Sequence, residues 1–159
     1  MKVELQNKLF NNYPKIFVNK YKSPHEFPMA FGIDFDDGWF WLLDGLCESI
    51  QSYINLNHKS QIRAMQIKEK FGRLRFYHDN GYGYAWENSE PEDTMELDST
   101  EYIDGMISLA ENLSGTICEI CGTTKEIGIS VDWIKTICQT CHNGSRNKEK
   151  KWLASSRLQ

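Results

Sequence analysis

Cys118-Glu119-Ile120-Cys121 and Cys138-Gln139-Thr140-Cys141 are the stretches that decide the fold of this chain. In each stretch two thiols stand three positions apart, so both sulfurs can face one point from a tight turn, and sixteen residues separate the two pairs. Two such pairs at this separation are typical of one tetrahedral zinc site with four cysteine ligands. His142 is an alternative to Cys141 as the fourth ligand. Two separate redox dithiols are the other interpretation, which is disfavoured because no βαβ pattern surrounds either pair.

The residues around the two pairs predict a small metal-bound unit. Gly122 suits the left-handed turn that follows such a cysteine pair. Ile127, Ile129 and Val131 alternate with other residues, which predicts a hairpin between the pairs. A turn, a hairpin and a helix would form a treble clef, whereas two turns would form a zinc ribbon, and a predicted helix over residues 145–155 favours the treble clef. Four protein ligands leave no open coordination position, so we expect a structural site rather than a catalytic one.

Size and composition narrow the possible classes of protein. The 159 residues suffice for one full core with a small appendage, and 40% of them are hydrophobic. The net charge of −4 argues against a protein built to coat nucleic acid or an anionic membrane. No apolar run reaches membrane-spanning length and no signal peptide is recognised. With four of five cysteines in metal spacing and Cys47 expected in the core, this pattern predicts a reducing, cytoplasmic location.

The chain divides into two predicted parts. Residues 1–115 are expected to form an α+β body in which a small sheet, a β-hairpin, packs on two helices. Residues 116–159 are expected to form the treble-clef or ribbon-like zinc unit with a basic tail. The second predicted helix of the body runs almost directly into Cys118. We therefore expect the zinc unit to dock on the body rather than to swing free.

Two amphipathic helices are predicted in the body, after a short helix over residues 2–10. Asp36 or Asp37 is expected to cap the first amphipathic helix, and Asp98 with Glu101 forms a capping-box-like start to the second. Apolar residues then recur at helical spacing in both segments. The predicted core faces are Leu43, Leu46, Cys47, Ile50 and Ile54 in the first helix, and Ile103, Met106, Ile107, Ala110 and Leu113 in the second.

Residues 62–68 and 73–78 predict two strands joined by a turn over residues 69–72 with a glycine in it. This hairpin is rich in basic side chains. A basic strand face beside a tyrosine could follow a phosphate backbone, whereas the alternative is a solvated face that protects the sheet from aggregation. The candidate nucleic-acid or partner contacts here are Arg63, Lys68, Lys70, Arg73, Arg75 and Tyr77.

An acidic segment follows the hairpin, because residues 79–111 contain ten acidic residues and no lysine or arginine. The segment could cover the basic hairpin or compete for a basic partner. Its aromatic residues serve either its own packing or an interface. A short basic run in the C-terminal tail is a further candidate contact or simply a solvated end. The candidate contacts in these two segments are Tyr82, Tyr84, Trp86, Lys148, Lys150 and Lys151.

Several phrases of the sequence are distinctive as a set: Asp37-Gly38-Trp39-Phe40, the run Ile67-Lys68-Glu69-Lys70-Phe71-Gly72-Arg73-Leu74-Arg75-Phe76-Tyr77, the first cysteine pair with Gly122, and Trp133 with Thr136-Ile137-Cys138. Over residues 30–142 they resemble a family of small uncharacterised proteins encoded by bacteria and their phages. In that family the last metal ligand is often a histidine, which matches His142. The resemblance implies no catalytic activity. It implies a setting of phages and mobile elements, in which small proteins often bind and inhibit or redirect a host protein.

Three functions remain as hypotheses. The first is a zinc-stabilised protein–protein interaction protein, with a host protein as the partner. The second is a nucleic-acid-binding accessory protein that uses the basic hairpin and tail. The third is a metal-dependent nuclease, in which His142-Asn143 would begin a motif whose second histidine and acid are missing. No catalytic residue is predicted.

Overall fold

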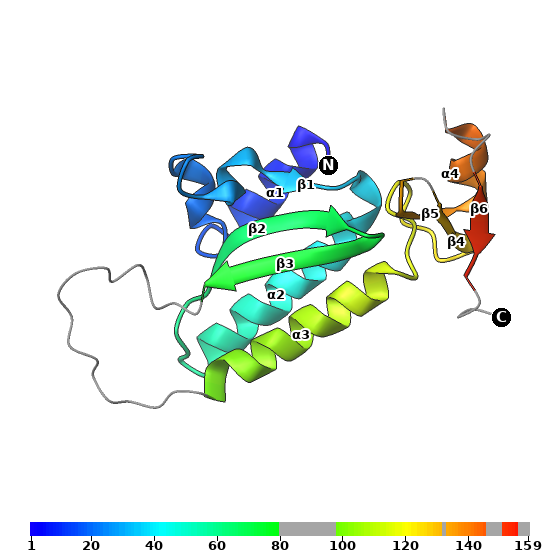
Figure 1. Cartoon of the computed structure of the whole chain (residues 1–159). Coiled ribbons are helices and arrows are strands. Elements are labelled where there is room, and N and C mark those ends of the chain that lie inside the picture. The colour runs from blue at the N-terminus through cyan, green and yellow to red at the C-terminus, as the bar shows by residue number, and fades with distance from the viewer. Residues whose placement is uncertain (80–97, 132, 146–150, 156–159) are drawn as a thin grey trace.

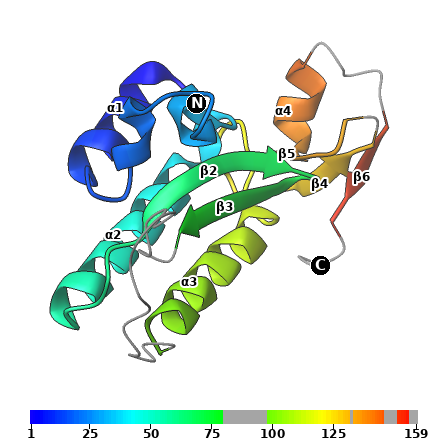
Figure 2. The same cartoon turned by 60° about the vertical axis from the view of Figure 1, so that its left-hand side comes forward.

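The computed structural model describes residues 1–79, 98–131, 133–145 and 151–155 (Figure 1). The described residues form four α-helices and two three-stranded sheets, which confirms the predicted α+β class. Residues 116–155, which we call the cysteine unit, lie at one end of the larger body (Figures 1 and 2). Among the described residues, no helix combines the length and the apolarity that crossing a bilayer requires.

The body contains one sheet packed on two long helices. β1 (Ile33–Asp34) runs parallel to β2 (Arg63–Lys70), and β2 pairs antiparallel with β3 (Arg73–Asp79). α2 (Phe40–Leu56) and α3 (Asp98–Ser114) run in opposite directions under one face of this sheet (Figures 1 and 2). The remaining helices of the body are α1 (Val3–Asn12) and three 3-10 helices, η1 (Val18–Tyr21), η2 (Pro28–Phe31) and η3 (Asp37–Trp39).

The predicted apolar faces of α2 and α3 form most of the core between helices and sheet. All five predicted positions of α2 are buried, together with Leu74 and Phe76 of β3, which point toward the helices. In α3, Met106 is half-buried and packs against the core, whereas Leu113 is 42% exposed, so the apolar face was predicted correctly except at Leu113. Both residues line a groove that opens between α2 and α3.

The β2–β3 hairpin is tighter than the predicted turn. Lys70 pairs with Arg73, so the loop is only Phe71 and Gly72, whose φ angles are 54° and 73°. Positive φ at both central positions is the mark of a type I′ turn, which matches the twist of the flanking strands. The Glu69 carboxylate accepts a hydrogen bond from the Gly72 N–H at 2.6 Å and so reinforces the turn.

Side chains of α3 protect the outer edge of β3. Ser114 Oγ accepts a hydrogen bond from the Leu74 N–H at 2.9 Å, and Glu111 Oε1 accepts one from the Phe76 N–H at 3.1 Å. These bonds satisfy N–H groups that would otherwise be left open at a sheet edge. They also fix the end of α3 at the start of the cysteine unit.

The predicted aspartate cap of α2 was wrong. α2 starts at Phe40, after a 3-10 turn, and neither segment has a side-chain cap hydrogen bond. The Asp37 carboxylate instead accepts the Lys2 N–H at 2.7 Å and pairs with Lys2 Nζ at 2.9 Å. Asp36 pairs with Lys135 of the cysteine unit. Long-range ion pairs therefore replace the local cap.

The cysteine unit contains the second sheet. β4 (Ile127–Ser130) lies between β5 (Lys135–Cys138) and β6 (Trp152–Ala154), and both neighbours are antiparallel to it, which confirms the predicted hairpin. The short helix α4 (Gln139–Gly144) follows Cys138 directly. Among the described residues, its core is small: it consists of Cys118, Ile127, Ile137 and Cys138, with Cys141 and Trp152 against it.

The predicted helix over residues 145–155 was wrong at its C-terminal end, because residues 152–154 form β6. Gly128 of β4 explains this pairing: a Cβ there would lie 2.5 Å from Trp152 Cζ2, so the indole ring lies in the space that the missing side chain leaves. The Trp152 indole N–H donates to the Ile137 carbonyl at 3.1 Å. Tertiary packing of one tryptophan therefore sets a strand where local sequence favoured a helix.

Candidate metal centre

The four cysteines of the two pairs converge on one point. The sulfurs of Cys118, Cys121, Cys138 and Cys141 all lie within 4.8 Å of one another, and the Cys121 and Cys138 sulfurs are 3.8 Å apart. In a regular tetrahedron with metal–sulfur bonds of about 2.3 Å, the sulfurs are separated by about 3.8 Å. The cluster can therefore hold one tetrahedral metal ion.

The first pair lies in a tight turn that follows α3. The Gly122 N–H donates to the Cys118 carbonyl at 2.8 Å, and the Cys118 N–H donates to the Thr123 carbonyl at 2.8 Å. Gly122 has a φ of 79°, a conformation that glycine adopts without strain. These features place Cys118 and Cys121 on the same side of the turn, as the sequence predicted.

The second pair lies where β5 meets α4. Cys138 is the N-cap of α4, and its sulfur accepts the Cys141 N–H at 3.3 Å. Cys141 stands in the first turn of the helix. A thiolate at a helix N-terminus is stabilised by the free N–H groups and by the positive end of the helix dipole.

The electrostatics of the cluster favour a bound cation. Burial raises the pKa of Cys118, but hydrogen bonds from the backbone N–H groups of Cys121, Cys138 and Ile120 outweigh it, so the pKa lies below its usual value. Burial raises the pKa of Cys121 and of Cys141, and the neighbouring Cys118 sulfur adds to both increases. Four thiolates so close together repel one another unless a metal ion offsets their charge.

His142 does not belong to the converging group. Its buried ring lies against the indole of Trp152, with ring centroids 6.4 Å apart. Among the described residues, the four cysteines are the one group of three or more metal-ligating side chains.

The turn that carries Cys118 and Cys121 is docked on the start of α2. The Gly38 N–H donates to the Glu119 carbonyl at 2.7 Å, and the Trp39 indole N–H donates to the Ile117 carbonyl at 2.9 Å. A Cβ at Gly38 would lie 2.5 Å from the Gly122 nitrogen and 2.6 Å from the Glu119 oxygen. The body and the metal-ligating turn thus meet backbone to backbone, which only glycine at position 38 permits.

A buried ionic group completes this contact. Glu119 is fully buried, and its Oε1 accepts from Lys135 Nζ at 2.9 Å and from the Asp36 N–H at 3.2 Å. Lys135 Nζ also pairs with Asp36 Oδ2 at 2.8 Å. Burial raises the pKa of Glu119 although Lys135 opposes the change, whereas the two carboxylates outweigh burial and raise the pKa of Lys135. No local pattern predicted this triad, because its members are far apart in the chain.

The hairpin tip forms the other contact between body and cysteine unit. The Thr136 hydroxyl donates to the Gly72 carbonyl at 2.6 Å, and the Thr136 carbonyl accepts the Glu119 N–H at 2.9 Å. β5 is therefore held by the hairpin on one side and by the metal-ligating turn on the other. The start of α2, the hairpin tip and the first cysteine pair, all distinctive in the sequence, meet at this one boundary.

The basic residues of the hairpin are largely engaged within the fold. Arg63 and Arg75 form ion pairs with carboxylates at 2.8 and 2.9 Å, and Arg73 donates to a main-chain carbonyl of α3 at 2.9 Å. Lys68 Nζ lies 5.6 Å from the centroid of the Tyr77 ring, and Lys70 Nζ lies 5.4 Å from that of Phe71. Of the other predicted contacts, Tyr77 and Lys151 are exposed, whereas Tyr82, Tyr84, Trp86, Lys148 and Lys150 lie outside the described residues.

Comparison of the chain with protein-family models, with curated proteins and with solved structures finds no significant match. Inference about function therefore rests on the chemistry of its own residues.

Proposed function

We propose that the protein is a zinc-stabilised protein-interaction module. The observation that carries this proposal is an apolar groove that lies open between α2 and α3. Its apolar lining includes Trp41, Leu42 and Leu46 of α2 and Met106, Leu109 and Leu113 of α3. Contiguous apolar surface that is left exposed on a folded protein often marks an interaction site.

Zinc is the metal that suits the cysteine cluster. Four thiolates in tetrahedral geometry are the usual set for structural zinc, which has no geometric preference of its own. Our proposal of a treble clef is supported by a turn with two cysteines, a β-hairpin, and a helix whose cap and first turn carry the other two cysteines. Such a site leaves no open position for a substrate, so the metal stabilises the fold.

The partner that we propose is a protein of the host cell. The resemblance to bacterial and phage proteins supports this, because small phage proteins often act by binding a host protein.

The proposal predicts that a native partner co-purifies with the wild type from cells that express the protein. Leu109→Glu, at a side chain that is 60% exposed, should abolish this co-purification without lowering the melting temperature.

Phe31→Glu is the matched control for that experiment, because Phe31 is 81% exposed and lies outside the groove. It should leave co-purification intact. If no protein co-purifies with the wild type, or if Leu109→Glu keeps the partner, the interaction function at this groove is wrong.

Nucleic-acid binding is a second candidate, and one observation favours it. Lys68 is paired across the strands with Arg75, and Lys70 with Arg73. Like charges directly opposite each other destabilise a sheet, and an anionic partner would relieve the repulsion.

This candidate function predicts that the protein shifts nucleic acid in a gel and that the shift weakens steeply as the salt concentration rises. The double substitution Lys68→Gln with Lys70→Gln should reduce the shift. Lys8→Gln with Lys15→Gln, which removes the same charge from α1 and the turn after it, should have no effect. Absence of a shift at low salt would eliminate this function.

A further inference from the structure

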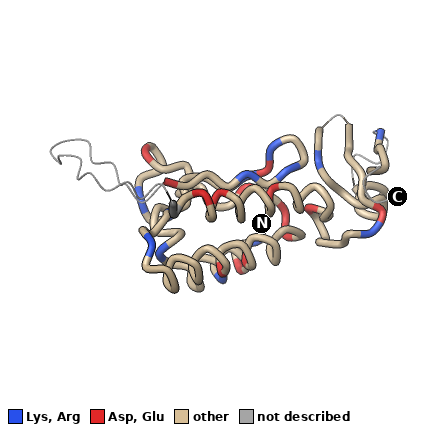
Figure 3. Tube along the Cα trace, turned by 90° about the horizontal axis from the view of Figure 1, so that it is seen from below, with Lys and Arg blue, Asp and Glu red and all other residues tan. Residues whose placement is uncertain are grey.

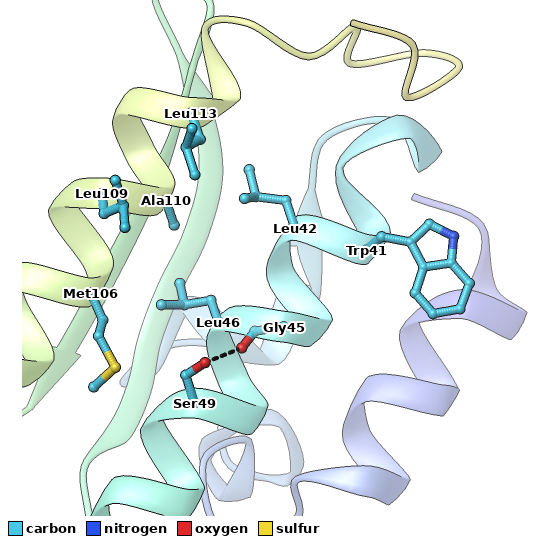
Figure 4. A pocket seen from close by; sticks show the side chains of 9 residues that line it. All are labelled: Trp41, Leu42, Gly45, Leu46, Ser49, Met106, Leu109, Ala110 and Leu113. Atoms are coloured by element: carbon cyan, nitrogen blue, oxygen red, sulfur yellow. Dashed lines mark hydrogen bonds between the residues drawn. The ribbon is translucent and has the colours of Figure 1, made fainter.

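The groove between α2 and α3 has the shape of a binding site for a helix. Figure 4 shows Leu42 and Leu46 of α2 and Met106 and Leu113 of α3 directed toward the space between the two helices. Trp41 projects from the other side of α2, and its indole is exposed. The groove has a volume of about 350 Å³. Parallel rows of leucine and methionine with a trough between them accept the apolar face of an amphipathic helix.

One end of the groove continues to the metal centre. Trp41 and Leu42 also line an adjoining recess with Ile120 and Cys121 of the metal-ligating turn. The docking of that turn on Gly38 fixes this recess relative to α2. The apolar surface is therefore longer than the groove alone, and a partner of several helical turns can lie along it.

The acidic residues beside the groove indicate which charge the partner helix carries on either side of its apolar stripe. The sequences of α2 and α3 together contain six acidic residues and no lysine or arginine. Figure 3 marks the acidic and basic residues along the Cα trace. Glu48 is exposed one helical turn from Gly45, which lines the groove. Glu101 is exposed in the same four-residue row as Gly105 and Leu109. A helix with lysine or arginine beside its apolar stripe meets opposite charge on both sides.

A second copy of the chain fits this surface poorly. Two copies that packed through α2 and α3 would bring acidic helices together, and the whole chain carries a net charge of −4. Like-charge juxtaposition at an interface costs several kcal/mol. Electrostatic complementarity therefore favours a basic partner over self-association.

We propose that the α2/α3 groove binds an amphipathic helix of the partner protein that carries basic residues on both flanks of its apolar stripe. This inference rests on the proposed interaction function and specifies the chemistry of the partner. The apolar stripe enters the groove between Leu42, Leu46 and Leu109. The basic flanks face Glu48 on one side and Glu101 on the other.

The test uses a synthetic peptide of 17 residues, the length of α2, with leucine at the a and d positions of each heptad and lysine on the flanks. A twin peptide has glutamate in place of every lysine. Fluorescence anisotropy with the full chain should show binding of the lysine peptide that weakens in salt, and at least about tenfold weaker binding of the twin. Amide shifts in NMR spectra should be confined to residues 41–49 and 106–113 and to the metal-ligating turn.

Leu109→Glu separates groove binding from unspecific attraction. A new carboxylate would strengthen unspecific binding of a cationic peptide, whereas it should weaken binding in the groove by about tenfold because it removes apolar contact. Stronger or unchanged binding would overturn the proposal.

Paired charge reversals test the flanks. Glu48→Lys with Glu101→Lys should weaken binding of the lysine peptide by about tenfold. Glu4→Lys with Glu26→Lys changes two exposed acids elsewhere and gives the same net charge, so it should change binding by less than about threefold. Equal effects of the two pairs would overturn the basic-flank assignment.

Two further outcomes would also overturn the proposal. One is equal affinity for the lysine and glutamate peptides. The other is a dimer of the wild type in light scattering that Leu109→Glu dissociates, because the occupant would then be a second copy. If the peptide test fails while a native partner still requires Leu109, the partner's chemistry is wrong but the interaction function stands.

Discussion

Replacing Cys138 with serine is expected to release the metal and unfold the cysteine unit. Cys138 is buried, supplies one of the four sulfurs, and caps α4 by accepting the Cys141 N–H. Structural zinc binding contributes about 10–16 kcal/mol in small zinc modules, which is comparable to the whole stability of a domain. The small hydrophobic core of this unit, in which two of the four buried apolar residues are cysteines of the cluster, cannot offset that loss.

Metal content and thermal unfolding, measured on the same sample, check this prediction. Wild type should carry one zinc ion per chain, and Cys138→Ser should carry none and lose the NMR signals of the folded residues after 116. Cys47→Ala is the matched control, since Cys47 is buried in the body and lies outside the cluster. It should keep the metal and lose about 1–2 kcal/mol of stability. A Cys138→Ser variant with full zinc and an unchanged melting temperature would contradict the proposed site.

Gly38→Ala is expected to separate the metal-ligating turn from the body. The added Cβ would overlap main-chain atoms of Gly122 and Glu119, at 2.5 and 2.6 Å, and these atoms cannot rotate away as a flexible side chain would. The hydrogen bond from Gly38 to Glu119 would be stretched or lost. We expect a loss of about 3 kcal/mol, which for a chain of this size lowers the melting temperature by about 10 °C.

Gly105→Ala is the control for the loss of a glycine. Gly105 is exposed inside α3, and a Cβ there would meet no atom within 4 Å. Alanine should raise stability by about 1 kcal/mol because it favours the helix. Gly38→Ala should also retain zinc, since it changes no ligand, so zinc content separates its effect from that of Cys138→Ser. A Gly38→Ala variant as stable as the wild type would show that the turn is not held against the body in this way.

These two predictions concern the same boundary from opposite sides. The proposed metal would hold the turn together from within, and Gly38, Glu119 and Lys135 hold the turn against the body. Because this turn also lines the recess at the end of the groove, we expect metal loss to weaken partner binding even though no ligand faces the groove between α2 and α3.

Local patterns in the sequence were enough to predict most elements and the cysteine cluster. Helical spacing of apolar residues predicted α2 and α3, a turn with a glycine predicted the β2–β3 hairpin, and alternation predicted β3 and the β4–β5 hairpin. The spacing of the two cysteine pairs predicted four ligands at one site, and the structure brings those four sulfurs together. Periodicity and ligand spacing are properties of short segments, so they can be recognised without knowledge of the tertiary contacts.

Local patterns were enough for the α+β class and for the residues able to hold a metal, because backbone periodicity and thiol spacing belong to short segments. Tertiary structure decided the rest. It turned Asp36 from an expected cap into a partner of Lys135, 99 positions away, and it made residues 152–154 a strand by pairing them with β4. It also left Met106 and Leu113 facing an open groove. Each outcome depends on contacts between residues that are far apart in the sequence. Such contacts outweigh local conformational preference when they bury more apolar area or pair a charged group.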